Sequence, residues 1–265
     1  MTAREALAEA AARLAAAGIE TAEWEARQLV SHAARVTPTG LAAEPDAVVP
    51  RDALEPLLRR RESREPLAYV LGEWGFRRLT LRADARALVP RPETEVVVER
   101  CLALLAGLDR PRVLDVGTGT GAIALAIADE HPGARVTGVD TSAEALSLAR
   151  ENAGLTGLGV DLREGGVEVA AEGWDLVVSN PPYVSAGELE TLEPEVRDWE
   201  PRGALVDTGL HERLARAART RFLVLEVGAC QAGNVAALLA DLGYSGTTIS
   251  RDLAGVERVV EAERA

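Results

Sequence analysis

The sequence has 265 residues, of which 47% are hydrophobic and 27% charged, an ordinary globular composition that can bury a core without disulfide or metal support. Its 42 acidic residues outnumber 29 basic ones, all of them Arg, and the formal net charge is −13. The absence of Lys excludes Schiff-base and P-loop lysine chemistry. The acidic balance argues against tight non-specific binding to nucleic acid, which needs clustered positive charge.

Cysteine and histidine are scarce, and their positions exclude further classes. Cys101 and Cys230 are far apart, and no cysteine or histidine pair has the spacing of a metal site. We therefore expect no metal, no disulfide framework and a reducing, cytoplasmic environment. The N-terminus lacks the apolar core of a signal peptide, and no charge-free stretch approaches the roughly 18 apolar residues of a membrane span.

The first part of the chain is predicted to be helical. Amphipathic patterns indicate helices over residues 3–17, 21–34 and 51–64. The run Arg59–Arg61 in the third pattern is interpreted as a solvated helix face, because Glu55, Glu62 and Glu65 lie beside it. Alternating residues and paired glycines between 66 and 82 then predict a β-hairpin.

These patterns predict three regions. We expect a helical N-terminal domain over residues 1–66, a hairpin linker over 67–92 and a larger domain over 93–265 that opens with a helix at 93–106. In the larger domain, short apolar strands alternate with helices. The strands are predicted at 113–116, 134–139, 176–179 and 222–226, and the helices at 122–129 and 142–152. This alternation predicts an α/β fold with a mostly parallel sheet, whose ligands bind at the carboxyl ends of the strands.

A glycine-rich loop follows the first of these strands. Asp115 lies near the end of the strand, and Gly117-Thr118-Gly119-Thr120-Gly121 follows it and leads into a helix. The backbone N–H groups of this loop can approach a carboxylate or phosphate closely. Asp140 closes the next strand, where a carboxylate can accept both hydroxyls of a ribose and disfavours the 2′-phosphate of NADP. A glycine turn alone is also common as a purely structural feature. The full order of strand, glycines, helix, strand and acid favours a nucleotide-type cofactor.

A second polar loop follows the strand at 176–179. It reads Asn180-Pro181-Pro182-Tyr183. Each residue before a Pro is held extended, so the Asn180 side-chain oxygen and the Pro181 carbonyl can accept the two in-plane N–H groups of an amide or exocyclic amine. Tyr183 can pack against that flat group and favour a nearby sulfonium. A turn residue followed by a strand terminator is the plain structural alternative.

The glycine loop resembles motif I of class I S-adenosylmethionine methyltransferases, because NAD proteins typically show Gly-x-Gly-x-x-Gly. Most of the chain resembles the PrmC (HemK) family of release factor glutamine methyltransferases. The resemblance extends from about Glu65 to Val260. It is carried by Glu65–Tyr69, Val89–Glu95, Asp115–Gly121, Asn180–Tyr183 and Glu200–Leu205.

The resemblance implies a class I S-adenosylmethionine-dependent methyltransferase with a Rossmann-like, seven-stranded sheet, a small N-terminal helical domain and a β-hairpin bridge. The implied substrate is the glutamine in the Gly-Gly-Gln motif of class I peptide chain release factors, methylated on N5. Catalytic roles fall to Asn180, Pro181 and Tyr183, and Pro182 joins them in substrate binding. The implied cofactor-binding residues are Asp115, Gly117, Thr118, Gly119, Thr120, Gly121, Asp140 and Asn180. We expect a monomer.

One stretch departs from the family. An acidic residue followed by an aromatic often stands near the adenine, whereas this chain has Arg163-Glu164-Gly165-Gly166-Val167. The departure leaves open a paralogue that methylates glutamine in another protein.

Two further functions stay open. N6-adenine nucleic-acid methyltransferases share the Asn-Pro-Pro-Tyr element, but they must handle a phosphate backbone and extract a base, which a Lys-free chain at −13 suits poorly. A non-catalytic S-adenosylmethionine-binding module would leave the same element unused.

Overall fold

The computed structural model describes residues 1–264 and divides into two compact units. The first consists of Met1–Gly72 together with the short segment Glu193–Trp199. The second consists of Glu73–Leu192 and the chain from Glu200 onward. The limit of the first unit, Gly72, lies beyond residue 66, where the sequence pattern places the domain boundary. In residues 1–264, no helix is both long and apolar enough to cross a membrane.

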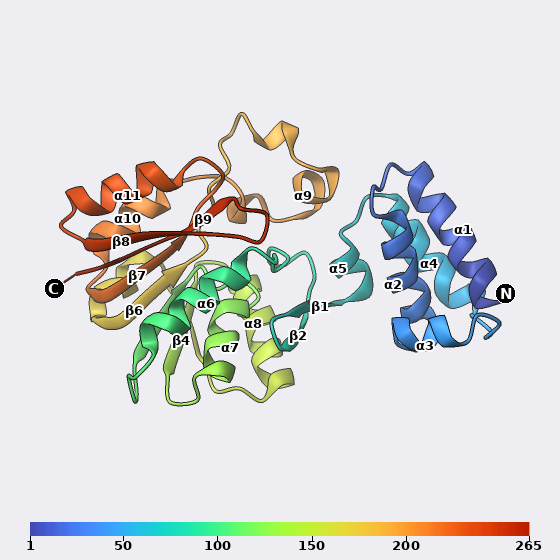
Figure 1. Ribbon diagram of the computed structural model, residues 1–265, viewed down its shortest axis with the longest axis horizontal. Coiled ribbons are helices and arrows are strands. Elements are labelled where there is room, and N and C mark those ends of the chain that lie inside the picture. The colour runs from blue at the N-terminus through green and yellow to red at the C-terminus, as the bar shows by residue number, and fades with distance from the viewer. Residues whose placement is uncertain (265) are drawn as a thin grey trace. The chain divides into compact units, whose positions relative to one another are not determined.

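The first unit is a helical cluster (Figure 1). A capping box begins its first helix, because the Thr2 hydroxyl accepts from the Glu5 N–H and the Glu5 carboxylate accepts from the Thr2 N–H. Leu14, Leu29 and Leu58 come from different helices and are buried together in the interior. The helices are α1 (Ala3–Ala16), α2 (Ala22–Ala34), α3 (Pro38–Ala43), α4 (Arg51–Glu62), α5 (Leu67–Leu71) and α9 (Pro194–Trp199).

A buried ion pair fastens α9 to the other helices of this unit. Arg61 is only 3% exposed, and its guanidinium donates to Glu25 at 2.5 Å and to Glu195 at 2.6 Å. Arg64 donates to the second oxygen of Glu195 at 2.7 Å. The interpretation of Arg59–Arg61 as a solvated face is therefore wrong for Arg61. Its position three residues after Leu58 turns it toward the buried face of α4.

A seven-stranded sheet organises the second unit, as expected for the fold class. The strand order is β5-β4-β3-β6-β7-β9-β8. The strands are parallel from β5 to β7, and β9 runs antiparallel to both of its neighbours. The strands are β3 (Arg112–Val116), β4 (Arg135–Asp140), β5 (Asp161–Glu164), β6 (Trp174–Ser179), β7 (Thr220–Glu226), β8 (Ser245–Arg251) and β9 (Glu257–Glu263).

Helices cover both faces of the sheet (Figure 1). Side chains alternate along each strand, so Val113 and Leu176 pack in the layer with α6 and α7, whereas Leu114 and Val177 pack in the layer with α10 and α11. The helices of this unit are α6 (Thr94–Leu105), α7 (Ala122–Glu130), α8 (Ala143–Thr156), α10 (Leu210–Ala217) and α11 (Ala232–Asp241), with short 3-10 turns η1 (Val167–Glu172), η2 (Leu189–Thr191) and η3 (Arg202–Ala204).

The sheet has a topological switch point between β3 and β6. The chain moves outward from β3 through β4 to β5, and then returns to β6 on the other side of β3. The Ser179 hydroxyl donates to the Val116 carbonyl at 2.7 Å and ties the carboxyl ends of these two strands together. Crevices at such points are where open α/β sheets bind ligands.

The bridge between the units differs from the sequence expectation. Residues 67–71 form the short helix α5, which begins after Pro66 and ends at Gly72 in the left-handed conformation. The hairpin is confined to β1 (Glu73–Phe76) and β2 (Leu79–Arg82). A short, continuous apolar run such as Leu67–Val70 does not distinguish a helix from a strand.

Candidate active site

A cavity of about 510 Å³ lies at the carboxyl ends of β3, β4 and β6. The glycine loop after β3, Asp140 at the end of β4, and Asn180 just after β6 all line it. These three segments were singled out separately in the sequence, and the parallel sheet brings them to one edge.

The glycine loop is shaped by left-handed backbone conformations. Gly117, Gly119 and Gly121 have φ angles of 75°, 55° and 82°, a region that strains other residues. The N–H groups of Gly117 and Thr118 both donate to the Val139 carbonyl, which holds the loop against the end of β4. Helix α7 begins directly after Gly121 on the cavity wall, so its first-turn N–H groups and the positive end of its dipole lie at the cavity.

Asp115 lies behind this loop and is outside the cavity lining. Its side chain is fully buried, and one carboxylate oxygen accepts from the Thr118 hydroxyl at 2.7 Å. Burial raises the pKa of Asp115 to about 7, although the Thr118 hydrogen bond opposes the shift. The contact visible in the structure is therefore support of the loop through Thr118.

Asp140 joins the loop to the cavity wall through both of its carboxylate oxygens. One oxygen accepts from the Gly119 N–H at 3.0 Å and the other from the Ser142 N–H at 2.9 Å. A carboxylate oxygen has two acceptor positions, so each keeps one for a ligand hydroxyl. The carboxylate can therefore hold the loop and bind a ribose at the same time.

The Asn-Pro-Pro-Tyr segment divides between the cavity and the interior. Asn180 and Pro182 line the cavity, whereas Pro181 is buried and Tyr183 is half-buried outside the lining. Within residues 1–264, the Asn180 side-chain oxygen and the Pro181 carbonyl accept no hydrogen bond. Both acceptors proposed from the sequence are thus uncommitted within the described chain.

Other lining residues were not singled out as site residues. Pro90, Arg91 and Thr94 belong to the Val89–Glu95 motif, and the loop Gly165–Glu168 contributes a further wall. Arg91 donates to the buried carboxylate of Glu200 at 2.6 Å, just before the lining residues Pro201 and Gly203. The signal for Pro90, Arg91 and Thr94 was membership in a family motif, and the signal for Gly165–Val167 was their departure from the family pattern. The placement of both segments depends on parts of the chain that are distant in sequence.

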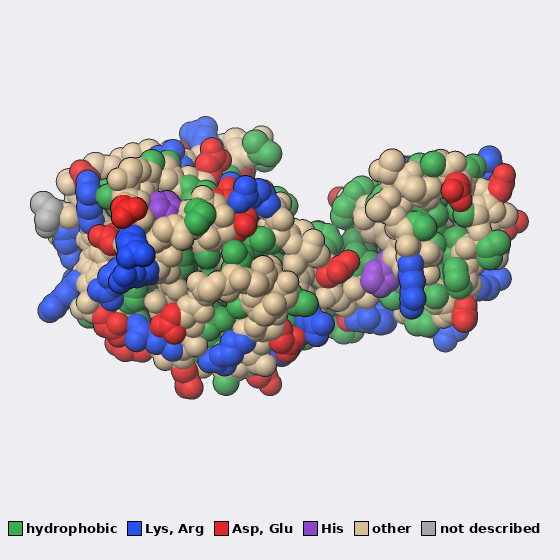
Figure 2. Space-filling view, turned by 90° about the horizontal axis from the view of Figure 1, so that it is seen from below, with side chains coloured by type: hydrophobic (Ala, Val, Ile, Leu, Met, Phe, Trp, Pro, Cys, Tyr) green, Lys and Arg blue, Asp and Glu red, His purple; other side chains and the backbone are tan. Residues whose placement is uncertain are grey.

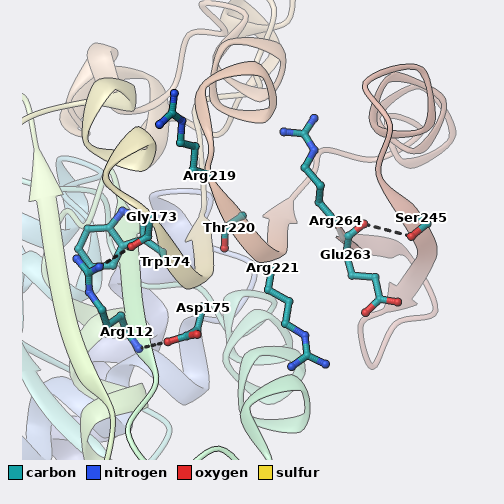
Figure 3. A pocket seen from close by; sticks show the side chains of 10 residues that line it. All are labelled: Arg112, Gly173, Trp174, Asp175, Arg219, Thr220, Arg221, Ser245, Glu263 and Arg264. Atoms are coloured by element: carbon teal, nitrogen blue, oxygen red, sulfur yellow. Dashed lines mark hydrogen bonds between the residues drawn. The ribbon is translucent and has the colours of Figure 1, made fainter.

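A second, more open cavity lies at the opposite ends of the strands (Figure 3). Its volume is about 690 Å³, and four arginines line it. The Arg112 guanidinium donates to the Gly173 carbonyl and lies 4.5 Å from the centroid of Trp174. Arg264 donates to the Ala218 and Leu242 carbonyls. Arg112 and Arg264 therefore support this edge of the sheet, which lies away from the Gly117–Gly121 loop.

Comparison with known proteins identifies the family. Residues 5–72 match the PrmC N-terminal domain model, and residues 96–193 match the methyltransferase small domain model. A release factor glutamine methyltransferase of Deinococcus radiodurans is 41% identical over 100% of this chain and 99% of its own length. One from Cereibacter sphaeroides is 40% identical over 99% of this chain and 98% of its own. This chain belongs to the release factor glutamine methyltransferase family.

Other members and solved structures agree with this placement. A release factor glutamine methyltransferase of Fusobacterium nucleatum is 38% identical over 80% of this chain. The match covers 63% of that protein's own length. Among solved structures, the hMettl16 catalytic domain superposes with a TM-score of 0.55 at 13% identity, covering 69% of this chain and 74% of its own. A methyltransferase from Pyrococcus furiosus gives 0.50 at 18% identity, covering 69% and 87%. These structures share the fold of the family's methyltransferase unit.

Proposed function

We propose that this protein transfers a methyl group from S-adenosylmethionine to the side-chain amide nitrogen, N5, of the glutamine in the Gly-Gly-Gln motif of class I peptide chain release factors. One observation carries the proposal. Asn180 presents an uncommitted amide oxygen to the same cavity that holds the glycine loop and Asp140. Two full-length relatives named release factor glutamine methyltransferase supply the substrate class.

The cavity suits S-adenosylmethionine in size and in chemistry. A volume of about 510 Å³ falls within the range of small-molecule sites. A Cβ added at Gly117, on the cavity wall, would have no atom within 4 Å, so the space beside the loop backbone is open to a ligand. We infer that the loop and the start of α7 hold the methionine end and that Asp140 holds the ribose.

The adenine end is assigned to a part of the chain that departs from the family pattern. Gly165, Gly166 and Val167 line the cavity, so an apolar side chain and backbone stand where an acidic residue and an aromatic are common. The Gly166 N–H donates to the Glu168 carboxylate at 2.6 Å, which fixes this loop. We infer that the adenine lies against Val167 and the Gly165–Gly166 backbone.

The main task of the protein is to orient a poor nucleophile. An amide nitrogen has its lone pair delocalised, so it reacts only when it is held in line with the methyl group. We infer that the Asn180 side-chain oxygen and the Pro181 carbonyl accept its two N–H groups. Orientation of this kind contributes roughly 7–11 kcal/mol to lowering a barrier. When bound, S-adenosylmethionine would supply the methyl group. The N–C bond would form as the methyl–sulfur bond breaks to leave S-adenosylhomocysteine, and one N–H proton would pass by way of the accepting oxygens to water.

The surface charge agrees better with a protein substrate than with nucleic acid. On the face seen in Figure 2, arginine and acidic side chains are intermixed over the surface of both units. On this face a phosphate backbone would meet repulsion beside attraction, and the chain as a whole carries a net charge of −13. A cytoplasmic location and action as a monomer complete the proposal.

Labelled methyl transfer tests the proposal directly. The protein is incubated with S-adenosylmethionine carrying a labelled methyl group and, separately, with a purified class I release factor, the same factor with Ala in place of the Gly-Gly-Gln glutamine, and duplex DNA. We expect label only on the unaltered factor. Asn180→Ala should nearly abolish transfer, whereas Asn234→Ala, on the exposed side of α11, should retain it. Label on DNA, or equal labelling of the altered factor, would refute the proposal.

A further inference from the structure

A chain of hydrogen bonds runs from Asn180 into the interior of the second unit. The Asn180 Nδ2 group donates to the Thr94 hydroxyl oxygen at 3.2 Å, and that hydroxyl donates to Glu226 Oε2 at 2.7 Å. Thr94 is 4% exposed and Glu226 is 1% exposed. The three residues come from the end of β6, the start of α6 and the end of β7. Glu226 lies outside the cavity lining, and the Thr94 hydroxyl is hydrogen-bonded to both Glu226 and Asn180, so the contact of Glu226 with the cavity runs through Thr94 and Asn180.

These hydrogen bonds run in one direction, and that direction fixes which end of the Asn180 amide faces the cavity. An ionised carboxylate can only accept hydrogen bonds, so the single proton of the Thr94 hydroxyl is committed to Glu226. The Thr94 oxygen can then only accept from Asn180, which forces the NH₂ group inward. The amide oxygen consequently points the other way, where the glutamine N–H groups of the proposed substrate would be bound.

Tyr183 connects the same carboxylate to the other end of the Asn-Pro-Pro-Tyr segment. Its hydroxyl lies 3.5 Å from Glu226 Oε1, and its carbonyl accepts from Gln231 Nε2 at 3.0 Å. A Cβ on Gly228 would lie 3.0 Å from the Tyr183 ring, so the ring packs directly against that glycine. Glu226 is therefore connected to both ends of the segment, directly to Tyr183 and through Thr94 to Asn180.

We propose that Thr94 and Glu226 are positioning residues that hold the Asn180 amide with its oxygen toward the substrate. This inference rests on the proposed function, because it assigns the role of the Asn180 oxygen in that reaction. It adds Thr94, which lies on the cavity wall, and Glu226, which lies outside the lining, and it gives the Thr of the Val89–Glu95 motif a mechanistic purpose.

The charge state of Glu226 controls the direction in which the hydrogen bonds between Glu226, Thr94 and Asn180 run. Burial raises the pKa of Glu226 to about 7, opposed by Thr94 and by the charge of Arg258. Glu93 raises it further and the Tyr183 hydroxyl lowers it, while the His211 ring donates to the Glu226 backbone carbonyl at 2.8 Å. A protonated carboxyl can donate to Thr94. The Thr94 hydroxyl is then free to donate to Asn180, which turns the amide. The productive orientation is therefore lost as the pH falls through about 7.

Nuclear magnetic resonance of the Asn180 side chain tests the orientation without any substrate. With the amide nitrogen labelled, one NH₂ proton should exchange slowly above pH 7 and shift as the pH falls through about 7. Thr94→Val should abolish both effects, and Thr94→Ser should restore them. Thr220→Val, which removes a buried hydroxyl at the far end of β7, should leave them unchanged. An Asn180 signal identical in wild type and Thr94→Val would overturn the inference.

Kinetics with the release factor then separate positioning from folding. Thr94→Val should lower kcat/KM about 10- to 100-fold, with S-adenosylmethionine affinity within about threefold of wild type. Glu226→Gln should lower kcat/KM and remove the acid limb of its pH profile near 7. Glu261→Gln, the matched change at another buried carboxylate, should retain that limb. The double variant that combines Thr94→Val with Glu226→Gln should have a kcat/KM no lower than that of the less active single variant, because the two residues act through the same hydrogen bonds.

The two failures are distinguishable. Wild-type protein that methylates no release factor refutes the proposed function, and the resonance experiment still decides the orientation of Asn180. Wild-type protein that methylates the factor, with Thr94→Val equally active, overturns only the positioning role.

Discussion

Replacement of Asp140 by Asn offers a sharp test of how the cavity binds its cofactor. The two side chains have nearly the same size, yet the carboxylate accepts one backbone N–H on each oxygen, from Gly119 at 3.0 Å and from Ser142 at 2.9 Å. Asn has only one oxygen, so its NH₂ group must face one of these donors. The variant loses a charged acceptor for the ribose, and its NH₂ group faces the N–H of Gly119 or Ser142, so that two donors meet without an acceptor.

The expected loss follows from these contacts. A hydrogen bond to a charged group contributes about 1.5–3 kcal/mol, which corresponds to roughly a 10- to 150-fold weaker Kd. Asp140→Asn should therefore bind as weakly as Asp140→Ala or more weakly, although it is the more conservative change. Isothermal titration with S-adenosylhomocysteine measures the affinity. Asp175→Asn, which removes a carboxylate that accepts from the Arg112 N–H at the opposite edge of the sheet, is the control. Unaltered affinity in Asp140→Asn would refute the ribose assignment and the shared-acceptor reasoning.

Three further predictions concern stability. Arg61→Met removes the cation beside the buried Glu25 carboxylate, whereas Glu195 keeps Arg64, and it should cost about 3–5 kcal/mol of unfolding free energy in urea. A double-mutant cycle with Glu195→Gln should give a coupling of about 1 kcal/mol or more, and additive effects would contradict the ion pair. Gly138→Ala places a Cβ 2.8 Å from the Thr118 hydroxyl oxygen and should destabilise by about 1–3 kcal/mol, and an unchanged thermal midpoint would contradict this packing. The pKa of Asp115 is raised from 3.8 to about 7, so the native state binds this proton more tightly than the unfolded state, and the free energy of unfolding falls as the pH rises between these values. Asp115→Asn should flatten that part of the plot of unfolding free energy against pH. A slope as steep as in wild type would exclude Asp115 as its source.

Much of the second unit was predictable because its signals are local. The apolar strand 113–116 and the helix at 122–129 agree with β3 and α7 within a residue at each end, since burial on both faces of a parallel sheet requires a continuous apolar run. The antiparallel strands β8, at the edge of the sheet, and β9, between β8 and β7, were not predicted. Most of β8 is exposed and carries no periodic apolar pattern, so its pairing with β9 is what makes it a strand.

The candidate site divides in the same way. The glycine loop and the Asn-Pro-Pro-Tyr segment each act through their own backbone conformation, which Gly and Pro specify locally. Their meeting at one cavity follows from parallel strands, whose carboxyl ends share an edge. Asp115 was expected among the cofactor contacts. Its alternation along β3 directs it instead into the layer beneath α6 and α7.

The sequence by itself determined the family, the sheet, and the residue types that face a cofactor and a planar amide, because these depend on short motifs and on local periodicity. Tertiary structure alone decided that Thr94 and Glu226 stand behind Asn180, and that Arg61 is buried against Glu195. These partners are separated by 86 to 134 positions along the chain. A hydrogen bond, a desolvated charge or a raised pKa depends on which distant groups packing brings within about 3 Å, and sequence spacing carries no record of that distance.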